Sequence, residues 1–210
     1  MRVIAIDGPA GSGKSTVARS LAARLGLEYL DTGAMYRSVA FAAIRRNVDP
    51  ADADAVARIA EQVEIEVADV VTVDGVDATV EIRGPAVTQA VSVVAANPAV
   101  RKEMVRRQQE WAVGRGGGVV EGRDIGTVVF PDAELKVFLT ARDDERARRR
   151  SQEVRDLAYD EVAAAMARRD QVDSTRAASP LTKADDAVEI DTTELSVEEI
   201  VDHLLGRLGA

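Results

Sequence analysis

Short apolar runs alternate along the chain with longer segments in which apolar residues recur every three or four positions. The apolar runs lie at 3–6, 27–30, 119–120, 135–139 and 188–190, and they predict buried strands. The segments with helical spacing lie at 14–25, 34–46, 52–62, 86–96, 98–113, 143–155, 160–169 and 196–208. Because strands that alternate with helices form parallel sheets covered on both faces, this pattern predicts a three-layer α/β fold.

Residues 63–82 have a different pattern. Valine and isoleucine alternate with acidic residues on both sides of Asp74-Gly75, a pair typical of a hairpin turn. The alternation predicts a small antiparallel sheet, inserted in the main domain, with a structural role. The glycine-rich stretch 114–118 is predicted to be a flexible break before the next strand.

The composition limits the chemistry. The 210 residues suit one α/β domain with a small insert. The chain has no cysteine, which excludes disulfides, thiolate catalysis and cysteine metal sites and fits a reducing cytoplasm. The one histidine, His203, is predicted to be a surface or half-buried helix residue, because one imidazole cannot form a metal site alone.

The charge and the apolar runs also exclude whole classes of partner. A net charge of −9 argues against a general nucleic-acid binder. The start of the chain lacks the apolar core and cleavage site of a signal peptide, and no apolar run approaches the ~18 residues of a membrane span. We therefore expect a cytoplasmic protein with no membrane or nucleic-acid partner. We also expect a monomer, although the sequence itself does not report the oligomeric state. Clustered arginines in an acidic chain indicate a small anionic ligand.

A glycine-rich motif joins the first predicted strand to the first predicted helix and matches the P-loop pattern G-x-x-x-x-G-K-[ST]. Glycines let backbone N–H groups face phosphate oxygens, and the helix N-terminus adds partial positive charge. Lys14 is expected to reach the β- and γ-phosphates, and the Ser15 hydroxyl to ligate Mg²⁺. The alternative is a glycine turn that binds nothing. The residues predicted to bind ATP are Gly8, Pro9, Ala10, Gly11, Ser12, Gly13, Lys14, Ser15 and Thr16.

Candidate ligands for a second anion follow two other predicted strands. Thr32 and Arg37 follow the second strand, where they could bind a phosphate or could be an N-cap and a surface arginine. After the strand at 119–120, Arg123 offers a bidentate fork to a phosphate, and Asp124 can accept a hydrogen bond from the exocyclic amine of a base such as cytosine. The alternative for Arg123 is an ion pair with a nearby acid.

Arginines also gather in the segment 143–176. They are Arg146, Arg148, Arg149, Arg150, Arg168, Arg169 and Arg176. Arginines that close over a transferred phosphoryl group stabilise its charge and exclude water. The alternative is a solvated basic helix face. The chain also lacks an acid at the Walker B spacing of motor ATPases and the Asn-Lys-x-Asp run of guanine switches, so a small-molecule kinase is favoured.

Taken together, these residues resemble the bacterial cytidylate (CMP) kinases of the nucleoside monophosphate kinase superfamily. The resemblance rests on Asp7-Gly8-Pro9 before the P-loop, on 31–37, on 122–133 and on Arg176-x-x-x-Pro180-Leu181. It implies a P-loop kinase in pyrimidine metabolism that uses ATP with Mg²⁺ to phosphorylate CMP and dCMP to CDP and dCDP. Thr32 stands where serine is common, Glu121 stands where aspartate is common, and the lid segment is a few residues short.

The resemblance also implies an organisation and a set of roles. A single domain would have its core at 1–31, 98–142 and 177–210, a monophosphate-binding region at 32–97 and a short helical lid at 143–176. The implied CMP ligands are Thr32, Arg37 and Arg123 for the phosphate, Ser92, Arg101 and Asp124 for the cytosine ring, and Arg169 and Asp173 for the sugar. The implied catalytic residues are Lys14, Arg123 and Arg176.

Two alternatives stay open at this point. The acceptor could be UMP, AMP or a non-nucleotide such as shikimate, since the sequence does not fix the preference among CMP, dCMP and UMP. The chain could also be a nucleotide-binding regulatory module, which leaves the arginines at the strand ends without a purpose.

Overall fold

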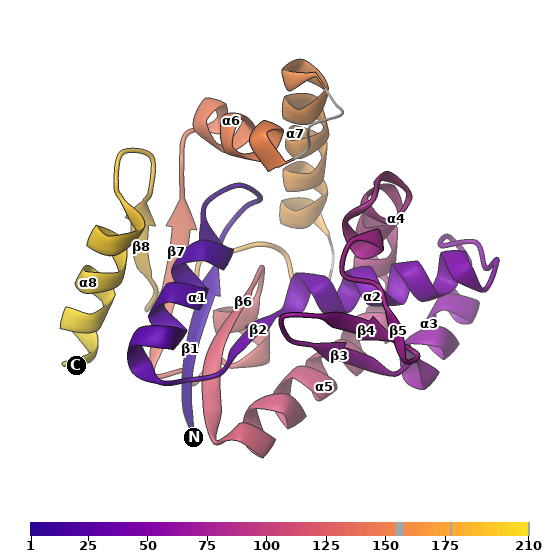
Figure 1. Ribbon diagram of the computed structural model, residues 1–210, viewed down its shortest axis with the longest axis horizontal. Coiled ribbons are helices and arrows are strands. Elements are labelled where there is room, and N and C mark those ends of the chain that lie inside the picture. Colours follow the sequence, from indigo (N-terminus) through magenta and orange to yellow (C-terminus); the bar gives the residue numbers. More distant parts are fainter. Residues whose placement is uncertain (154–157, 177, 210) are drawn as a thin grey trace. The chain divides into compact units, whose positions relative to one another are not determined.

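The computed structural model describes residues 1–153, 158–176 and 178–209, which form two compact units (Figure 1). The first unit contains residues 1–29 and the chain from residue 115 onward, and the second contains residues 30–114. Residues 98–114, grouped with the core in the domain division expected from the sequence, cluster with the second unit. No helix in the described ranges is both long enough and apolar enough to cross a membrane.

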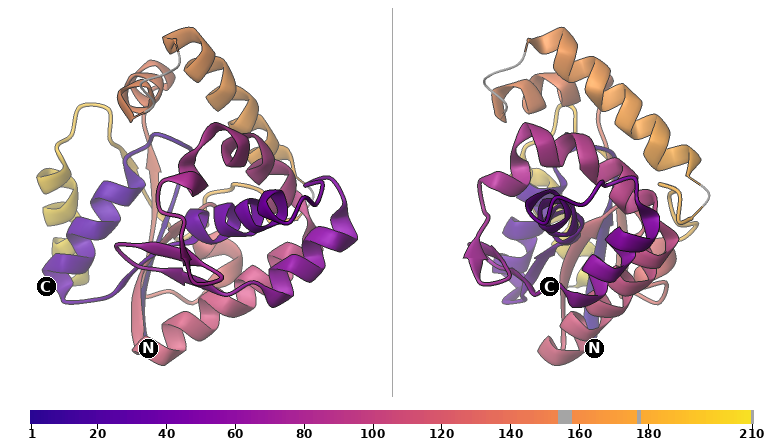
Figure 2. Two further views of the ribbon diagram at one scale, coloured as in Figure 1. Left: turned by 45° about the vertical axis from the view of Figure 1, so that its right-hand side comes forward. Right: turned by 90° about the vertical axis from the view of Figure 1, so that its right-hand side faces the viewer.

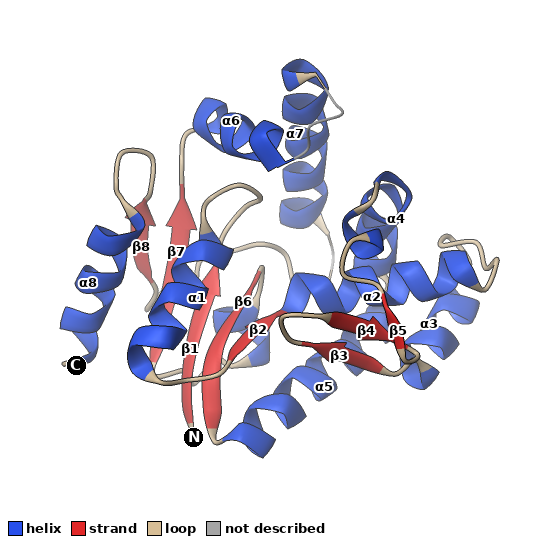
Figure 3. Cartoon of the chain, in the orientation of Figure 1, coloured by secondary structure: helices blue, strands red, loops and turns tan. Residues whose placement is uncertain are grey.

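The first unit contains four strands of a five-stranded sheet, whose remaining strand, β2, begins at Tyr29 and continues into the residues of the second unit (Figure 3). The sheet order is β2-β6-β1-β7-β8, with parallel pairing of β1 to β6, β1 to β7 and β7 to β8. The strands are β1 (Arg2–Asp7), β2 (Tyr29–Asp31), β6 (Gly117–Gly122), β7 (Leu135–Thr140) and β8 (Val188–Asp191). The prediction of a parallel central sheet is confirmed. Asp7 lies opposite Gly122 in the register, at the carboxyl edge where open α/β sheets bind ligands.

Two helices, α1 (Lys14–Leu25) and α8 (Val197–Leu208), pack on one face of this sheet in an aliphatic core. Ile4, Leu21, Leu139 and Leu204 are fully buried there. Burial of each such side chain contributes about 1.5–3 kcal/mol before entropy costs. A capping box begins α8, with the Ser196 hydroxyl accepting from the Glu199 amide at 3.2 Å.

The glycines before β6 have a different role from the predicted flexible break. β6 begins at Gly117, inside that stretch. Gly117 has φ 135°, and a Cβ there would lie 2.0 Å from the Arg2 carbonyl oxygen. Only glycine permits this close approach of two backbones, so the residue fixes the start of the strand instead of loosening it.

Two helices form the predicted lid region, α6 (Asp143–Glu153) and α7 (Tyr159–Thr175), and they pack against each other (Figure 2). Ala147, Val162 and Met166 are buried between them, with Ala10 of the P-loop against this cluster. The second helix runs to Thr175, past the predicted end at 169. The predicted helix residues 154 and 155 lie outside the described residues.

The second unit combines helices with the small antiparallel sheet that residues 63–82 predict. Its elements are α2 (Thr32–Arg45), α3 (Ala53–Gln62), β3 (Ile65–Val67), β4 (Val71–Val73), β5 (Val76–Asp77), a 3₁₀-helix (Glu81–Arg83), α4 (Pro85–Ala96) and α5 (Pro98–Arg115). The sheet order is β3-β4-β5, and Asp74 and Gly75 both have positive φ in the turn, as predicted.

The predicted strand character of Val80 and Ile82 is wrong. The Asp77 carboxylate accepts hydrogen bonds from the backbone N–H and the hydroxyl of Thr79, at 3.0 and 2.7 Å. This local turn ends β5, and Ile82 is buried on the 3₁₀-helix.

Candidate active site

The backbone of the P-loop, between β1 and α1, leaves no room for a Cβ atom at two of its glycines. A Cβ on Gly8 would lie 2.1 Å from the Leu139 carbonyl oxygen, and a Cβ on Gly11 would lie 2.7 Å from that of Arg146. Gly11 and Gly13 have φ of 73° and 84°, in the left-handed region that glycine favours. Gly13 is the N-cap of α1 and brings no side chain to cap it. The first N–H groups of α1 are therefore not capped by a side chain and can bind an anion.

Lys14 is the buried cation of this loop. Its Nζ donates to the Pro9 carbonyl at 2.6 Å, and the Ser12 hydroxyl donates to the same oxygen at 3.0 Å. Burial, followed by the neighbouring Arg123, lowers the pKa of Lys14 from 10.5 to about 7. Arg169 contributes in the same direction. A bound polyphosphate would reduce the repulsion among these positive charges, so the site favours an anion.

Ser15 has the chemistry expected of a magnesium ligand in a P-loop. Its side chain is exposed at the N-terminus of α1. The described residues contain no group of three carboxylate, histidine or cysteine side chains that could hold a metal by themselves. Mg²⁺ prefers oxygen ligands and keeps several waters, so one hydroxyl with nucleotide phosphates and water is a fitting set.

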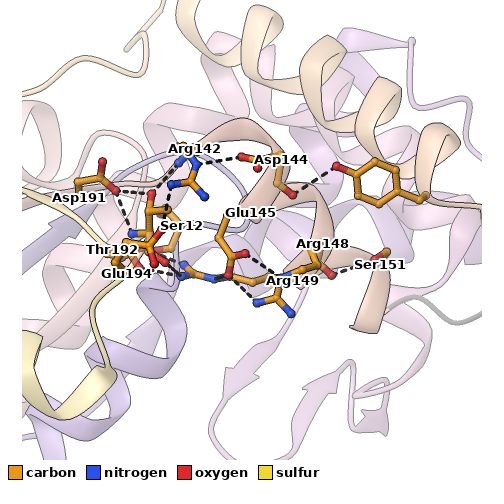
Figure 4. Close-up of polar contacts among 12 residues, drawn as sticks. Ser12, Arg142, Asp144, Glu145, Arg148, Arg149, Ser151, Asp191, Thr192 and Glu194 are labelled. Atoms are coloured by element: carbon orange, nitrogen blue, oxygen red, sulfur yellow. Dashed lines mark hydrogen bonds and ion pairs between the residues drawn. The ribbon is translucent and has the colours of Figure 1, made fainter.

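A pocket of about 240 Å³ lies beside the start of α1. It is lined by Gly13, Thr16, Val17, Arg149, Thr192, Leu195, Ser196, Val197 and Ile200. The Arg149 guanidinium is fixed at its edge, donating to the Thr192 carbonyl at 2.7 Å and hydroxyl at 2.9 Å, and to Glu145 at 2.8 Å (Figure 4). Thr192 in turn donates to the Ser12 carbonyl at 3.1 Å, which ties the loop after β8 to the P-loop (Figure 4).

No residue of the loop after β8 was predicted from the sequence to bind a ligand. Thr192 and Leu195 belong to no motif, and only their position just after a parallel strand could have indicated them.

In the first unit, three arginines surround one carboxylate. Asp173 on α7 accepts from Arg123 Nε at 2.9 Å, and it lies 3.9 Å from Arg169 Nε and 3.6 Å from Arg176 Nη1. Arg176 Nη2 also lies 3.7 Å from Asp124. The ion pair that was the alternative for Arg123 is therefore present. Burial, and then the charge of Arg123, lower the pKa of Arg169 to about 10.

In the second unit, Arg37 of α2 is buried, not a surface residue. Its Nη1 donates to the Ile82 carbonyl at 3.1 Å and to the Thr88 hydroxyl at 3.0 Å. Thr32 does not cap α2, because Asp31 is the N-cap and accepts from the Ala34 amide at 2.9 Å. An aspartate carboxylate is as good a cap as a hydroxyl, so Thr32, the first helical residue, is left buried beside the cap.

The predicted base ligands of the second unit lie on α4 and α5. The Arg101 guanidinium lies over the Tyr36 ring, 5.5 Å from its centroid, and donates to the Ala95 carbonyl at 3.3 Å. A cation over an aromatic face is held in orientation by the ring. Ser92 is half-buried on α4.

The chain matches the family model for cytidylate kinase over residues 4–209. A cytidylate kinase of Mycobacterium avium (strain 104) is 52% identical over 211 residues, covering 96% of this chain and 92% of that protein. One of Pelotomaculum thermopropionicum is 51% identical over 217 residues, covering 99% and 96%. The chain belongs to the cytidylate kinase family. The structure of a shikimate kinase from Bacteroides thetaiotaomicron is 15% identical and superposes with a TM-score of 0.50, over 100% of this chain and 99% of that chain. This likeness concerns the fold alone, and it confirms the predicted P-loop kinase architecture.

In this member of the cytidylate kinase family, the arginines of the predicted lid segment 143–176 differ in their contacts. Arg146 is buried and donates to the P-loop carbonyl of Ala10 at 3.0 Å, while it pairs with Asp143 and Asp170. Arg148 is 55% exposed and pairs with Glu145 on its own helix. Arg148 therefore fits the solvated helix face, and Arg146 lies against the P-loop.

Proposed function

We propose that this chain transfers the γ-phosphoryl group of ATP to CMP and dCMP, forming ADP and CDP or dCDP. Its membership of the cytidylate kinase family over residues 4–209 carries this proposal. The buried, charge-crowded Lys14 supports a polyphosphate donor at the P-loop. The buried Arg37 and the three arginines around Asp173 support an anionic acceptor, which a nucleotide-binding regulatory module would not require.

On the donor side, we assign the triphosphate to the P-loop and the adenine ring to the pocket beside Arg149. The backbone N–H groups of 8–16 and the Lys14 ammonium would hold the phosphates. The pocket has apolar walls from Leu195 and Ile200 and a planar guanidinium, a combination that accommodates a nucleobase. Ser15 would hold Mg²⁺, which supplies charge neutralisation of the β- and γ-phosphates.

On the acceptor side, we assign the CMP phosphate to Thr32, Arg37 and Arg123 and the cytosine ring to Ser92, Arg101 and Asp124. Asp124 suits cytosine because a carboxylate accepts from its exocyclic amine, whereas uracil offers a carbonyl there. Arg169 and Asp173 would contact the sugar. Because Asp173 pairs with Arg123, a bound phosphate must share the guanidinium with that carboxylate or replace it.

The chemistry needs no strong general base. An oxygen of the CMP phosphate, already anionic at neutral pH, forms the new bond to the γ-phosphorus. The bond from that phosphorus to the bridging oxygen breaks, and ADP leaves with the electron pair. Lys14, Arg123 and Arg176 would stabilise the charge on the transferred group, and positioning would supply the rest of the rate enhancement.

We further infer that the protein is a monomer and that it acts in the cytoplasm. Light scattering of the purified chain and cell fractionation test these two points.

Release of ADP from ATP and Mg²⁺ tests the activity with a panel of CMP, dCMP, UMP, AMP, dTMP and shikimate as acceptors. We expect rapid release with CMP and dCMP and slow release with the others. A flat panel, or ATP binding that no acceptor turns into ADP release, overturns the proposal. Selective stimulation by UMP, AMP or shikimate would reassign the acceptor and keep the donor site.

A further inference from the structure

Asp7 is the last residue of β1, directly before the P-loop, and its side chain binds two backbone amides that lie outside the P-loop. Its Oδ1 accepts from the Ile125 amide at 2.8 Å, and its Oδ2 accepts from the Gly126 amide at 2.7 Å. The side chain is buried, with the residue 5% exposed. These two amides are the first N–H groups of the π-helix Ile125–Val129, which no sequence pattern predicts. Asp7 thus caps a helix that begins 118 residues later in the chain.

The residue in the N-cap position of that helix is Asp124, and it makes no side-chain capping bond. An aspartate in this position normally accepts from the amide two or three residues on. Here the amide two residues on, that of Gly126, is bound by Asp7. The Asp124 carboxylate lies instead 3.7 Å from Arg176 Nη2.

The fit around Asp7 is close. A Cβ added to Gly126 would lie 3.4 Å from Asp7 Oδ2 and 3.2 Å from Lys136 Cγ, so the helix start is pressed against β1 and β7. A carboxylate offers two acceptors to the two amides. An asparagine offers one acceptor and sets an N–H₂ group against the second amide.

We propose that Asp7 is a positioning residue for base recognition: it takes over the capping of the helix 125–129, so that Asp124 presents its carboxylate to the cytosine ring. This inference rests on the proposed role of Asp124. When Asp7 is removed, the released Gly126 amide draws the Asp124 carboxylate back onto its own helix, away from the base.

The test compares kcat and KM for CMP, UMP and ATP in Asp7→Ala, Asp7→Asn, Asp124→Ala and the double variant Asp7→Ala/Asp124→Ala. Loss of a hydrogen-bonded charged acceptor corresponds to about a tenfold or greater effect. We expect Asp7→Ala to raise KM for CMP by about tenfold or more and to lower the preference for CMP over UMP, with KM for ATP changed by about twofold or less. Asp7→Asn, which keeps the volume and one acceptor, should show a smaller change of the same kind.

The double variant separates a positioning role from a structural one. If Asp7 acts through Asp124, adding Asp7→Ala to Asp124→Ala should change kcat/KM for CMP by about twofold or less. The inference is overturned if the effects of the two single substitutions on kcat/KM for CMP multiply in the double variant. It is also overturned if Asp7→Ala keeps the preference for CMP over UMP, or if Asp7→Ala raises KM for ATP as much as KM for CMP. If Asp124→Ala itself leaves the preference unchanged, the proposed role of Asp124 has failed, which is a separate result.

Two controls keep the test decisive. Asp52 is an exposed aspartate N-cap on α3 that accepts from the Ala55 amide at 3.0 Å and belongs to neither proposed site. Asp52→Ala should leave all three KM values unchanged. Thermal unfolding checks each protein; if Asp7→Ala does not fold, Asp7→Asn alone must reproduce the selective loss for CMP, and its failure to do so overturns the inference.

Discussion

Replacing Lys14 with methionine removes the buried cation of the P-loop and keeps a side chain of similar length. Burial and Arg123 lower the pKa of Lys14 from 10.5 to about 7. At about 1.4 kcal/mol per pKa unit, the charged ammonium costs the folded state up to about 5 kcal/mol. The lost hydrogen bond to Pro9 offsets part of the gain, although Ser12 still donates to that carbonyl at 3.0 Å.

We therefore expect Lys14→Met to be more stable than the wild type by about 1–3 kcal/mol, or about 2–7 °C in Tm, while it loses most turnover. The gain has a defined pH dependence. Because folding lowers the pKa of Lys14, the cost is fully present below about pH 7 and disappears as the pH rises toward 10.5. The difference in stability between the two proteins should accordingly shrink above about pH 7.

The assay is thermal unfolding without nucleotide at about pH 6 and about pH 9.5, with ADP release as the measure of turnover. Lys183→Met is the matched control, since Lys183 is an exposed lysine paired with Glu189 at 2.6 Å. It should change stability by less than about 1 kcal/mol and keep turnover. A Lys14→Met protein that is less stable than the wild type at about pH 6, or that still turns over, refutes this reasoning.

Four further changes test other parts of the structure. Gly11→Ala, which adds a Cβ 2.7 Å from the Arg146 carbonyl oxygen, should weaken ATP binding about tenfold or more by calorimetric titration. Arg149→Ala should raise KM for ATP about tenfold and leave KM for CMP unchanged in steady-state assays. Thr88→Val, which removes the hydroxyl 3.0 Å from Arg37 Nη1, should raise KM for CMP about three- to tenfold with kcat retained. Burial raises the pKa of Asp7 to about 6, so Asp7 stays protonated to a higher pH in the folded state than in the unfolded state. The wild type should therefore lose up to about 3 kcal/mol of unfolding free energy between about pH 4 and about pH 7. Urea unfolding across this range should show that Asp7→Asn lacks this part of the loss.

Much of the fold could be predicted because its signals are local. Apolar runs of a few residues mark β1 and β7, and the spacing of Val17 and Leu21 marks the buried face of α1. The P-loop has a fixed motif, and its glycines are required by positive φ and backbone contacts within a short segment. The turn at Asp74-Gly75 is likewise predicted by these two residues themselves, which tolerate the positive φ that the turn requires.

The remaining features depend on contacts between residues that are distant in the sequence. Asp7 caps a helix start 118 residues away, and no pattern near either end indicates it. Thr192 joins Ser12 across 180 residues. One open alternative was decided by a local contact: Asp31, and not Thr32, caps α2. The roles assigned to the CMP ligands stay predictions, since they depend on where a bound nucleotide lies.

Calorimetric titration of CMP and of cytidine into the wild type, Arg37→Ala and Arg123→Ala tests most directly the claim that guanidinium groups hold the acceptor phosphate. We expect the wild type to bind CMP at least about 100-fold more tightly than cytidine. Each variant should lose most of that difference and keep its affinity for cytidine within about twofold. Equal affinities of the wild type for CMP and cytidine, or an undiminished preference for CMP in both variants, would contradict the claim.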